Sequence, residues 1–116
     1  MIGIDLIKTS RMKDMITRFE TKALQKFLSE SEIKLVKNHK TASGFWAAKE
    51  AFSKALGTGI GKDCGFNDIV IYKSERGAPR FNISEKIINK FNITSTSLSI
   101  THDGEYAIAV VAIETK

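Results

Sequence analysis

Residues 42–57 read Ala-Ser-Gly-Phe-Trp-Ala-Ala-Lys-Glu-Ala-Phe-Ser-Lys-Ala-Leu-Gly, and this stretch decides the fold. Its apolar side chains recur three and four positions apart, which is the spacing of one face of an amphipathic helix. The predicted core face consists of Phe45, Ala48, Phe52, Ala55 and Leu56. The adjacent side consists of Trp46, Lys49, Glu50, Ser53 and Lys54. Gly57 stands where a glycine commonly ends a helix, so we predict one long helix over residues 42–56.

Shorter elements surround this helix. Residues 2–7 are β-branched-rich and apolar at both odd and even positions, which predicts a buried strand. We predict further helices at 10–28, 29–36 and 84–91, and strands at 69–73, 80–83, 97–101 and 106–113. No repeat or linker divides the sequence. We therefore expect a single α+β domain over residues 1–116, with a mainly antiparallel sheet packed against the long helix.

Composition limits the class of protein. Of 116 residues, 42% are hydrophobic and 27% are charged, which is typical of a soluble globular domain. The single cysteine, Cys64, excludes an internal disulfide and fits a reducing compartment. The apolar stretches are far shorter than the roughly 20 residues of a membrane span, and no charged segment typical of a signal peptide precedes the first one. We expect a cytoplasmic protein with no membrane partner.

The positive charge is concentrated near the N-terminus. The net charge is +5, and residues 1–40 hold nine basic and five acidic side chains, a net +4. On a continuous helix, Arg11, Met15, Arg18 and Lys22 would form one stripe, because they are spaced four, three and four apart. A basic stripe with one methionine suits an acidic amphipathic helix as partner, although an ordinary solvated face has the same pattern.

Two carboxylates need an explanation. Asp5 interrupts an apolar strand, and a buried carboxylate is costly unless it is paired, hydrogen-bonded or bound to a metal. Glu50 lies between Lys49 and Lys54 in the long helix. That spacing fits a surface ion pair, and it equally fits a ligand of a hard cation with lysines that hold phosphate oxygens.

Other kinds of site are excluded or unsupported. The glycines after residue 56 follow a helix, whereas a dinucleotide fingerprint places them before one, and Leu56 and Asp63 replace residues that a Walker A loop requires. One cysteine and two histidines cannot form a closed zinc site. The spacing of Cys64, His102 and Asp103 gives no support to a nucleophilic triad.

Four motifs, in the order in which they occur along the chain, resemble those of a known family. They are Gly3-Ile4-Asp5, the block from Trp46 to Gly59, Gly77-Ala78-Pro79, and Ser99-Ile-Thr-His102. Together they resemble the holo-[acyl-carrier-protein] synthase family, the small bacterial type of 4'-phosphopantetheinyl transferase. The resemblance covers essentially the whole chain, and its most specific part is Lys-Glu-Ala-Phe-Ser-Lys-Ala-Leu-Gly-Thr-Gly.

The resemblance implies an activity. Members of the family transfer the 4'-phosphopantetheine group from coenzyme A to a serine of an apo acyl carrier protein, in fatty-acid biosynthesis, and release adenosine 3',5'-bisphosphate. Carried over, Asp5 and Glu50 would bind Mg²⁺ and act in catalysis with Lys54. Arg11 matches a family arginine that meets the acidic carrier helix, which gives the basic stripe of Arg11, Met15, Arg18 and Lys22 a candidate partner. The resemblance leaves the general base open between a water on the metal and a carboxylate at the site.

The resemblance also implies a coenzyme A site and an assembly. The predicted coenzyme A ligands are Lys49, Lys54, Gly57, Gly77, Pro79 and His102, with backbone amides at Gly57 reaching the nucleotide. Larger relatives contain two such units in one chain, so we expect a homotrimer whose active sites are shared between subunits. Phe45 and Ala78 stand where the family usually has basic residues, which leaves coenzyme A affinity and carrier choice open. The alternatives are a small basic nucleic-acid-binding protein and a non-catalytic carrier-binding module.

Overall fold

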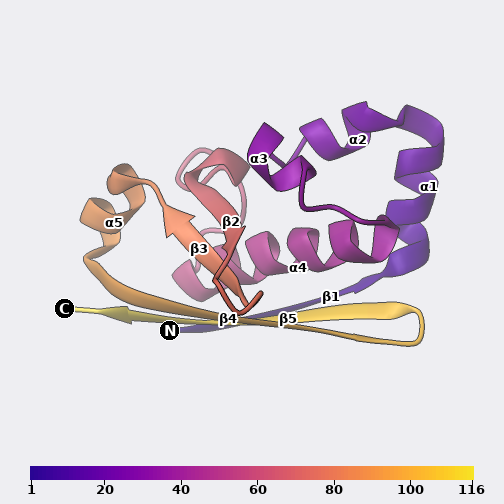
Figure 1. The fold of residues 1–116 in the computed structure, drawn as a ribbon. Coiled ribbons are helices and arrows are strands. Elements are labelled where there is room, and N and C mark those ends of the chain that lie inside the picture. The colour runs from indigo at the N-terminus through magenta and orange to yellow at the C-terminus, as the bar shows by residue number, and fades with distance from the viewer.

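The long helix lies across one face of a three-stranded antiparallel sheet, and a separate two-stranded hairpin stands beside it (Figure 1). A computed structural model describes residues 1–116. The elements are β1 (Ile2–Lys8), α1 (Thr9–Phe19), α2 (Thr21–Gln25), α3 (Glu30–Ile33), α4 (His39–Leu56), a 3-10 turn η1 (Phe66–Asp68), β2 (Ile69–Lys73), β3 (Pro79–Ile83), α5 (Glu85–Phe91), β4 (Ile93–Asp103) and β5 (Tyr106–Thr115). The predicted α+β class is confirmed.

Helix α4 begins three residues before the predicted start, because an unrecognised cap precedes it. The side chain of Asn38 accepts hydrogen bonds from the backbone amides of Lys40 and Thr41. The predicted end is confirmed, since Gly57 adopts the left-handed conformation with φ 80°. Its amide donates to the carbonyl of Lys54, which closes the last turn.

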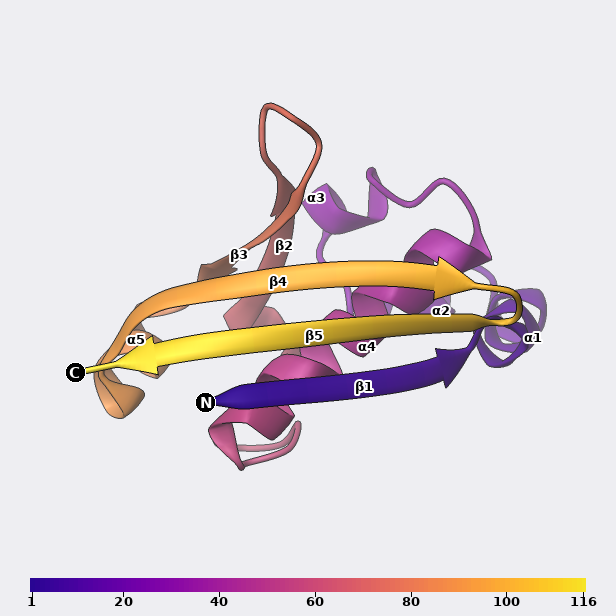
Figure 2. The same ribbon diagram turned by 90° about the horizontal axis from the view of Figure 1, so that it is seen from below.

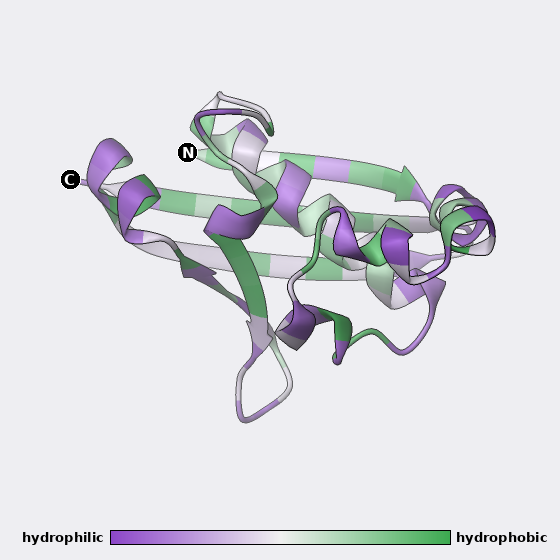
Figure 3. Cartoon of the chain, turned by 90° about the horizontal axis from the view of Figure 1, so that it is seen from above, coloured by the Kyte–Doolittle hydropathy of each residue, from purple (hydrophilic) through white to green (hydrophobic).

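Strand β5 lies in the middle of the larger sheet, between β1 and β4 (Figure 2). Its buried residues alternate along the strand and face α4; they are Ala107, Ala109, Val111 and Ile113. The predicted hairpin around residues 102–104 is confirmed: β4 is longer than predicted at both ends, and β5 starts at the predicted residue and ends two residues later. Figure 3, which looks onto the helical side, shows hydrophobic colour along β2 and along much of the strand layer beneath the helices.

The expectation that β1 is buried on both faces is wrong for one face. Ile2, Ile4 and Leu6 are 75%, 58% and 55% exposed, while Ile7 on the other face is buried. Ile4 pairs with Val110 of β5, which is also exposed, so the apolar outer surface extends across two strands. In β1, apolar residues at both odd and even positions therefore indicate an apolar outer face, which the single chain leaves exposed, in addition to the buried inner face.

The predicted helix over residues 10–28 is broken at Glu20, where φ is 53° and ψ is −135°. The break turns the chain so that Ala23 of α2 and Phe27 after it are buried in the core. Figure 1 shows the two helices running in different directions. Lys22 lies on α2 and not on α1, so the prediction that it continues one straight stripe with Arg11, Met15 and Arg18 is wrong.

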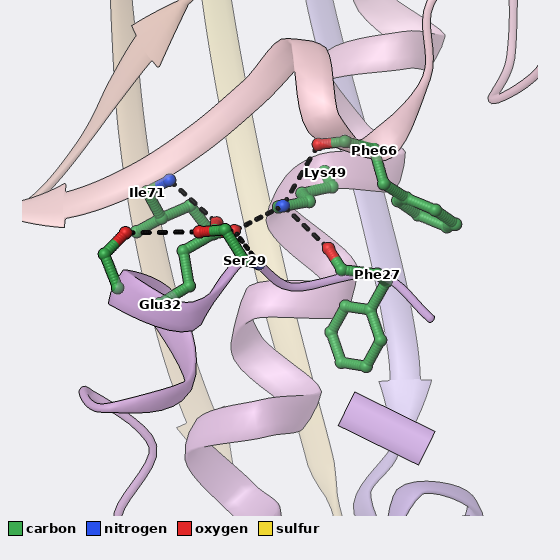
Figure 4. Close-up of polar contacts among 7 residues, drawn as sticks. Phe27, Ser29, Glu32, Lys49, Phe66 and Ile71 are labelled. Carbon is green, nitrogen blue, oxygen red and sulfur yellow. Dashed lines mark hydrogen bonds and ion pairs between the residues drawn. The ribbon is translucent and has the colours of Figure 1, made fainter. Parts of the chain in front are cut away.

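A buried ion pair joins α3 to α4 (Figure 4). The ammonium of Lys49 lies 2.9 Å from Oε1 of Glu32, and both side chains are fully buried. Lys49 also donates to the carbonyls of Phe27 and Phe66, at 2.7 and 3.1 Å. Glu32 accepts in addition from the backbone amides of Ser29 and Ile71. Each charge is thus paired and hydrogen-bonded, as burial requires.

The prediction that Lys49 binds coenzyme A is wrong. Its three protons are donated within the chain and its side chain has no exposed surface. Burial lowers the pKa of the Lys49 ammonium, and the hydrogen bond and the charge of Glu32 oppose that effect. Helical periodicity placed Lys49 beside Glu50, but it did not indicate that a second layer covers this side of α4.

Gly3 allows β1 to touch the backbone of α4. A Cβ atom at this position would lie 2.7 Å from the amide nitrogen of Ala55 and still closer to the carbonyl oxygen of Ala51. Backbone atoms cannot move aside as a flexible side chain does, so only glycine fits. The contact fixes the strand that carries Asp5 against the helix that carries Glu50 and Lys54.

Lys49→Met should lower the free energy of unfolding by about 3–5 kcal/mol, because it leaves Glu32 buried without its counter-charge and two carbonyls without a donor. Lys40→Met is a matched control on the same helix, because the Lys40 side chain is exposed; it should cost about 0.5 kcal/mol or less. Urea denaturation followed by circular dichroism measures both. Equal losses for the two variants would contradict the role of the buried pair.

Gly3→Ala should lower the free energy of unfolding by about 1–3 kcal/mol, because the new methyl group meets helix backbone. Gly61→Ala is the control, since a Cβ atom there meets nothing within 4 Å. Its effect should lie within about 0.5 kcal/mol of zero. Thermal unfolding of the two variants compares them, and a Gly3→Ala protein as stable as Gly61→Ala would show that β1 does not need this close approach.

Candidate functional site

Asp5, Glu50 and Lys54 meet where β1 passes the C-terminal half of α4, and we call them the carboxylate cluster. Asp5 lies on the inward face of β1 with its side chain largely buried. Its Oδ1 accepts a hydrogen bond of 2.7 Å from the ammonium of Lys54, which is half-exposed. This contact supplies the partner that an inward-facing aspartate requires.

The electrostatics of Glu50 show that the two carboxylates are close enough to interact. Burial raises the pKa of the Glu50 carboxyl above its ordinary value, and the negative charge of Asp5 raises it further. The positive charge of Lys54 acts in the opposite direction and is the weaker influence. Two carboxylates with one lysine leave an excess of negative charge, which favours a cation at this position.

The donor set suits a hard divalent cation. Asp5 and Glu50 offer only oxygen atoms, which are the ligands that Mg²⁺ prefers. No group of three or more acidic, histidine or cysteine side chains is placed to hold a metal. Two carboxylates fit Mg²⁺, which commonly takes one or two protein carboxylates together with water and phosphate oxygens.

A second candidate site is a cleft of about 480 Å³ beside the N-terminal half of α4, which we call the lysine cleft. It is lined by Lys34, Leu35, Lys37, Thr41, Gly44, Phe45, Lys73, Gly77, Pro79, Ile100 and His102. Three lysines and no acidic residue line it, so it favours an anionic ligand. Gly77, Pro79 and His102, predicted from distant positions of the sequence, come together here.

Sequence reasoning missed the lysines of this cleft. Lys34 and Lys37 follow α3, whereas Lys73 ends β2, and no spacing in the sequence links them. The ammonium of Lys73 lies 5.7 Å from the centre of the Phe45 ring, so this lysine supplies positive charge beside the position where the family's usual basic residue is absent. Only the tertiary structure reveals this combination.

His102 is held by α4. Its Nε2 lies 2.9 Å from the carbonyl oxygen of Lys40, and a carbonyl only accepts, so Nε2 carries the proton and donates. Gly44 gives the ring room, since a Cβ atom there would lie 3.3 Å from Nε2. The other ring nitrogen, Nδ1, is therefore the one left for a ligand.

Gly57 and Cys64 do not offer the groups that a phosphate site or a nucleophile would need. The amides of Gly57, Thr58 and Gly59 donate to carbonyls of the last turn of α4. None of the three is free for a nucleotide in this conformation, and Gly57 as a coenzyme A ligand stays a prediction. Cys64 is fully buried, and burial raises the pKa of its thiol to about 11. No helix combines the length and apolar character needed to cross a bilayer.

The carboxylate cluster and the lysine cleft lie toward opposite edges of the sheet. β1 and β4 flank β5, and α4 crosses them, with Gly3 against its C-terminal half and Ile100 and His102 against its N-terminal half (Figure 2). None of the cluster residues lines the cleft. The buried core between α4 and the sheet separates the two sites.

Of the four residues predicted to bind the carrier protein, three lie on one helix. Arg11, Met15 and Arg18 lie on α1, with both arginines exposed and Met15 partly buried. Lys22 stands beyond the break, on α2.

Comparison with known proteins identifies the family. The sequence pattern of the 4'-phosphopantetheinyl transferase superfamily matches residues 1–111. The chain is 68% identical over 114 residues to a holo-[acyl-carrier-protein] synthase of Sulfurimonas denitrificans, covering 98% of this chain and 94% of that protein. It is 58% identical over 113 residues to the one of Nautilia profundicola, covering 97% and 98%.

Solved structures agree with this assignment. The Helicobacter pylori holo-[acyl-carrier-protein] synthase in complex with coenzyme A superposes with a TM-score of 0.95 at 47% identity, covering 98% of this chain and 100% of that one. The Neisseria meningitidis enzyme gives a TM-score of 0.89 at 26% identity, covering 98% and 97%. With the fold, the matched residues and the sequence identities in agreement, the chain belongs to the 4'-phosphopantetheinyl transferase superfamily, among its holo-[acyl-carrier-protein] synthases.

Proposed function

We propose that this chain transfers the 4'-phosphopantetheine group of coenzyme A to a serine of an apo acyl carrier protein and releases adenosine 3',5'-bisphosphate. The observation that carries the proposal is the pairing of Asp5 and Glu50 beside the half-exposed Lys54. The serine oxygen forms a bond to the β-phosphorus of coenzyme A as its proton passes to a base at the site. The bond from that phosphorus to the bridging oxygen breaks, and this oxygen leaves on adenosine 3',5'-bisphosphate. The two carboxylates suit this chemistry through the cation that they would hold, because its positive charge and that of Lys54 would oppose the negative charge on the pyrophosphate.

Asp5 and Glu50 are the residues that would hold Mg²⁺. When bound, the ion supplies positive charge against the charge that develops on the pyrophosphate. Lys54 is half-exposed and reaches Asp5 through a flexible stem, so its ammonium can also contact a phosphate oxygen. Its positive charge stabilises the leaving side of the reaction.

The lysine cleft suits the nucleotide end of coenzyme A. Lys34, Lys37 and Lys73 provide charge for phosphate, and Phe45 and Pro79 provide apolar surface for a base. These three lysines supply positive charge in the cleft even though the usual basic residues are absent at positions 45 and 78.

The separation of the two sites supports a shared active site. The buried core between α4 and the sheet lies between the two sites, so we infer that a second copy brings its cleft to the cluster of the first. The exposed outer face of the sheet offers the surface for this contact, because Ile2, Ile4, Leu6 and Val110 lie there together. We propose a homotrimer, with the number three taken from the resemblance to the family.

Glu50→Gln should reduce transfer by about a hundredfold or more, because it removes one of two charged oxygen ligands. Intact mass spectrometry of apo acyl carrier protein, incubated with the protein, coenzyme A and Mg²⁺, measures the reaction. A chelator should abolish the mass gain in the unmodified protein. Glu85→Gln, on the distant helix α5, is the charge-matched control. Near-native turnover and Mg²⁺ dependence in Glu50→Gln would refute the metal assignment.

Ile4→Glu should prevent assembly, because it places a charge in the apolar outer face of the sheet. Sedimentation velocity should then give a monomer, where the unmodified protein gives a trimer, and transfer should fall with it. Thr17→Glu on the exposed surface of α1 is the control and should stay assembled. A monomeric unmodified protein with full activity would overturn the shared site.

A further inference from the structure

An exposed aromatic ring stands at the break between α1 and α2. Phe19 is 45% exposed, although most large apolar side chains of the helices are buried. Two cations lie close to it: the guanidinium carbon of Arg18 at 5.5 Å and the ammonium of Lys26 at 5.1 Å from the ring centre. Such cation–π contacts favour one orientation of the exposed ring.

The Phe19 ring extends the apolar part of the surface that Arg11, Met15 and Arg18 form on α1. Met15 and Phe19 are four residues apart, so they lie one above the other on α1. Arg11 and Arg18 border this pair on the same helix. The surface thus has an apolar ridge with positive charge beside it, which matches an amphipathic helix whose polar residues are acidic.

The break at Glu20 shapes this surface. Its φ of 53° and ψ of −135° form a conformation that a residue other than glycine adopts at a cost of about 1–3 kcal/mol, and such strain is often retained at functional sites. The turn brings Lys26 to the ring, where a straight helix would carry it farther along the axis. An open hollow of about 420 Å³, lined by Arg18, Phe19, Glu20, Thr21 and Lys22, lies beside the ring.

We propose that Phe19 is the apolar anchor of the carrier-binding surface, with Arg18 and Lys26 beside it as the charges that recognise an acidic helix. The partner is therefore a protein that presents an acidic amphipathic helix with an apolar side chain at its centre. This inference rests on the proposed function, because the acyl carrier protein is that partner. The inference adds Phe19, which was not part of the predicted basic stripe, to the residues that recognise the carrier.

Steady-state transfer kinetics with apo acyl carrier protein and coenzyme A test the anchor. Phe19→Ala should raise KM for the carrier about tenfold, while kcat and KM for coenzyme A stay within about twofold. Phe19→Leu keeps the apolar contact and should recover most of the loss. Unchanged KM for the carrier in a folded Phe19→Ala protein overturns the proposal, and so does an equal rise in KM for both substrates.

Two lysine variants test the proposed role of positive charge beside the ring. This test remains available if Phe19→Ala does not fold. Lys26→Gln should raise KM for the carrier severalfold and weaken its dependence on salt. Lys13→Gln removes the same charge from the opposite side of α1 and should have little effect. Equal values for these two variants overturn the proposal. An unmodified protein that transfers nothing refutes the proposed function itself, whereas an active protein insensitive to Phe19 and Lys26 refutes only this inference.

Discussion

The fully buried pair of Lys49 and Glu32 sets the arrangement on which the rest of the structure depends. It joins α3, α4, η1 and β2, because the two side chains bond to Phe27, Phe66 and Ile71 as well as to each other. Desolvating two charges is costly, so only this saturated set of hydrogen bonds is compatible with the position. In return the pair fixes the orientation of α4, because a rotation of this helix about its axis would break the three hydrogen bonds of Lys49.

The rotation of α4 in turn determines where the site lies. Successive residues of a helix differ by about 100° around its axis, so Lys49 pointing into the upper layer directs Glu50 and Lys54 to the side. Ala51 and Ala55 then face the sheet, where Gly3 meets them. Small residues on both sides bring β1 close enough for Asp5 to reach Lys54. The carboxylate cluster is thus a consequence of core packing, which explains how a strand tolerates an inward carboxylate.

The sequence predicted an element well where only one of its faces contacts other parts of the protein. It predicted less well where two faces of a helix or strand are involved. The periodicity of residues 42–56 located the helix and its end at Gly57, but it assumed one buried face; α4 lies between two layers, so Lys49 was misplaced. The same assumption failed for β1, where apolar residues on both faces reflected an exposed surface. Spacing also cannot reveal a backbone break such as that at Glu20, nor a cleft built from Lys37, Lys73 and His102 on separate elements.

The exposed sheet face and the divided site have one explanation in the proposed assembly. A chain that completed its own active site would have no need of an apolar outer surface on β1 and β5, and that surface would favour aggregation. A chain that covers this surface with copies of itself hides the apolar residues. The same step brings the cleft of one copy toward the cluster of the next. In the proposed assembly coenzyme A would bind across the contact between two copies, so its binding would stabilise the assembly as well as each chain. The proposal therefore links folding, association and catalysis through β1, which supplies Gly3 to the core, Asp5 to the candidate site and Ile4 to the outer face.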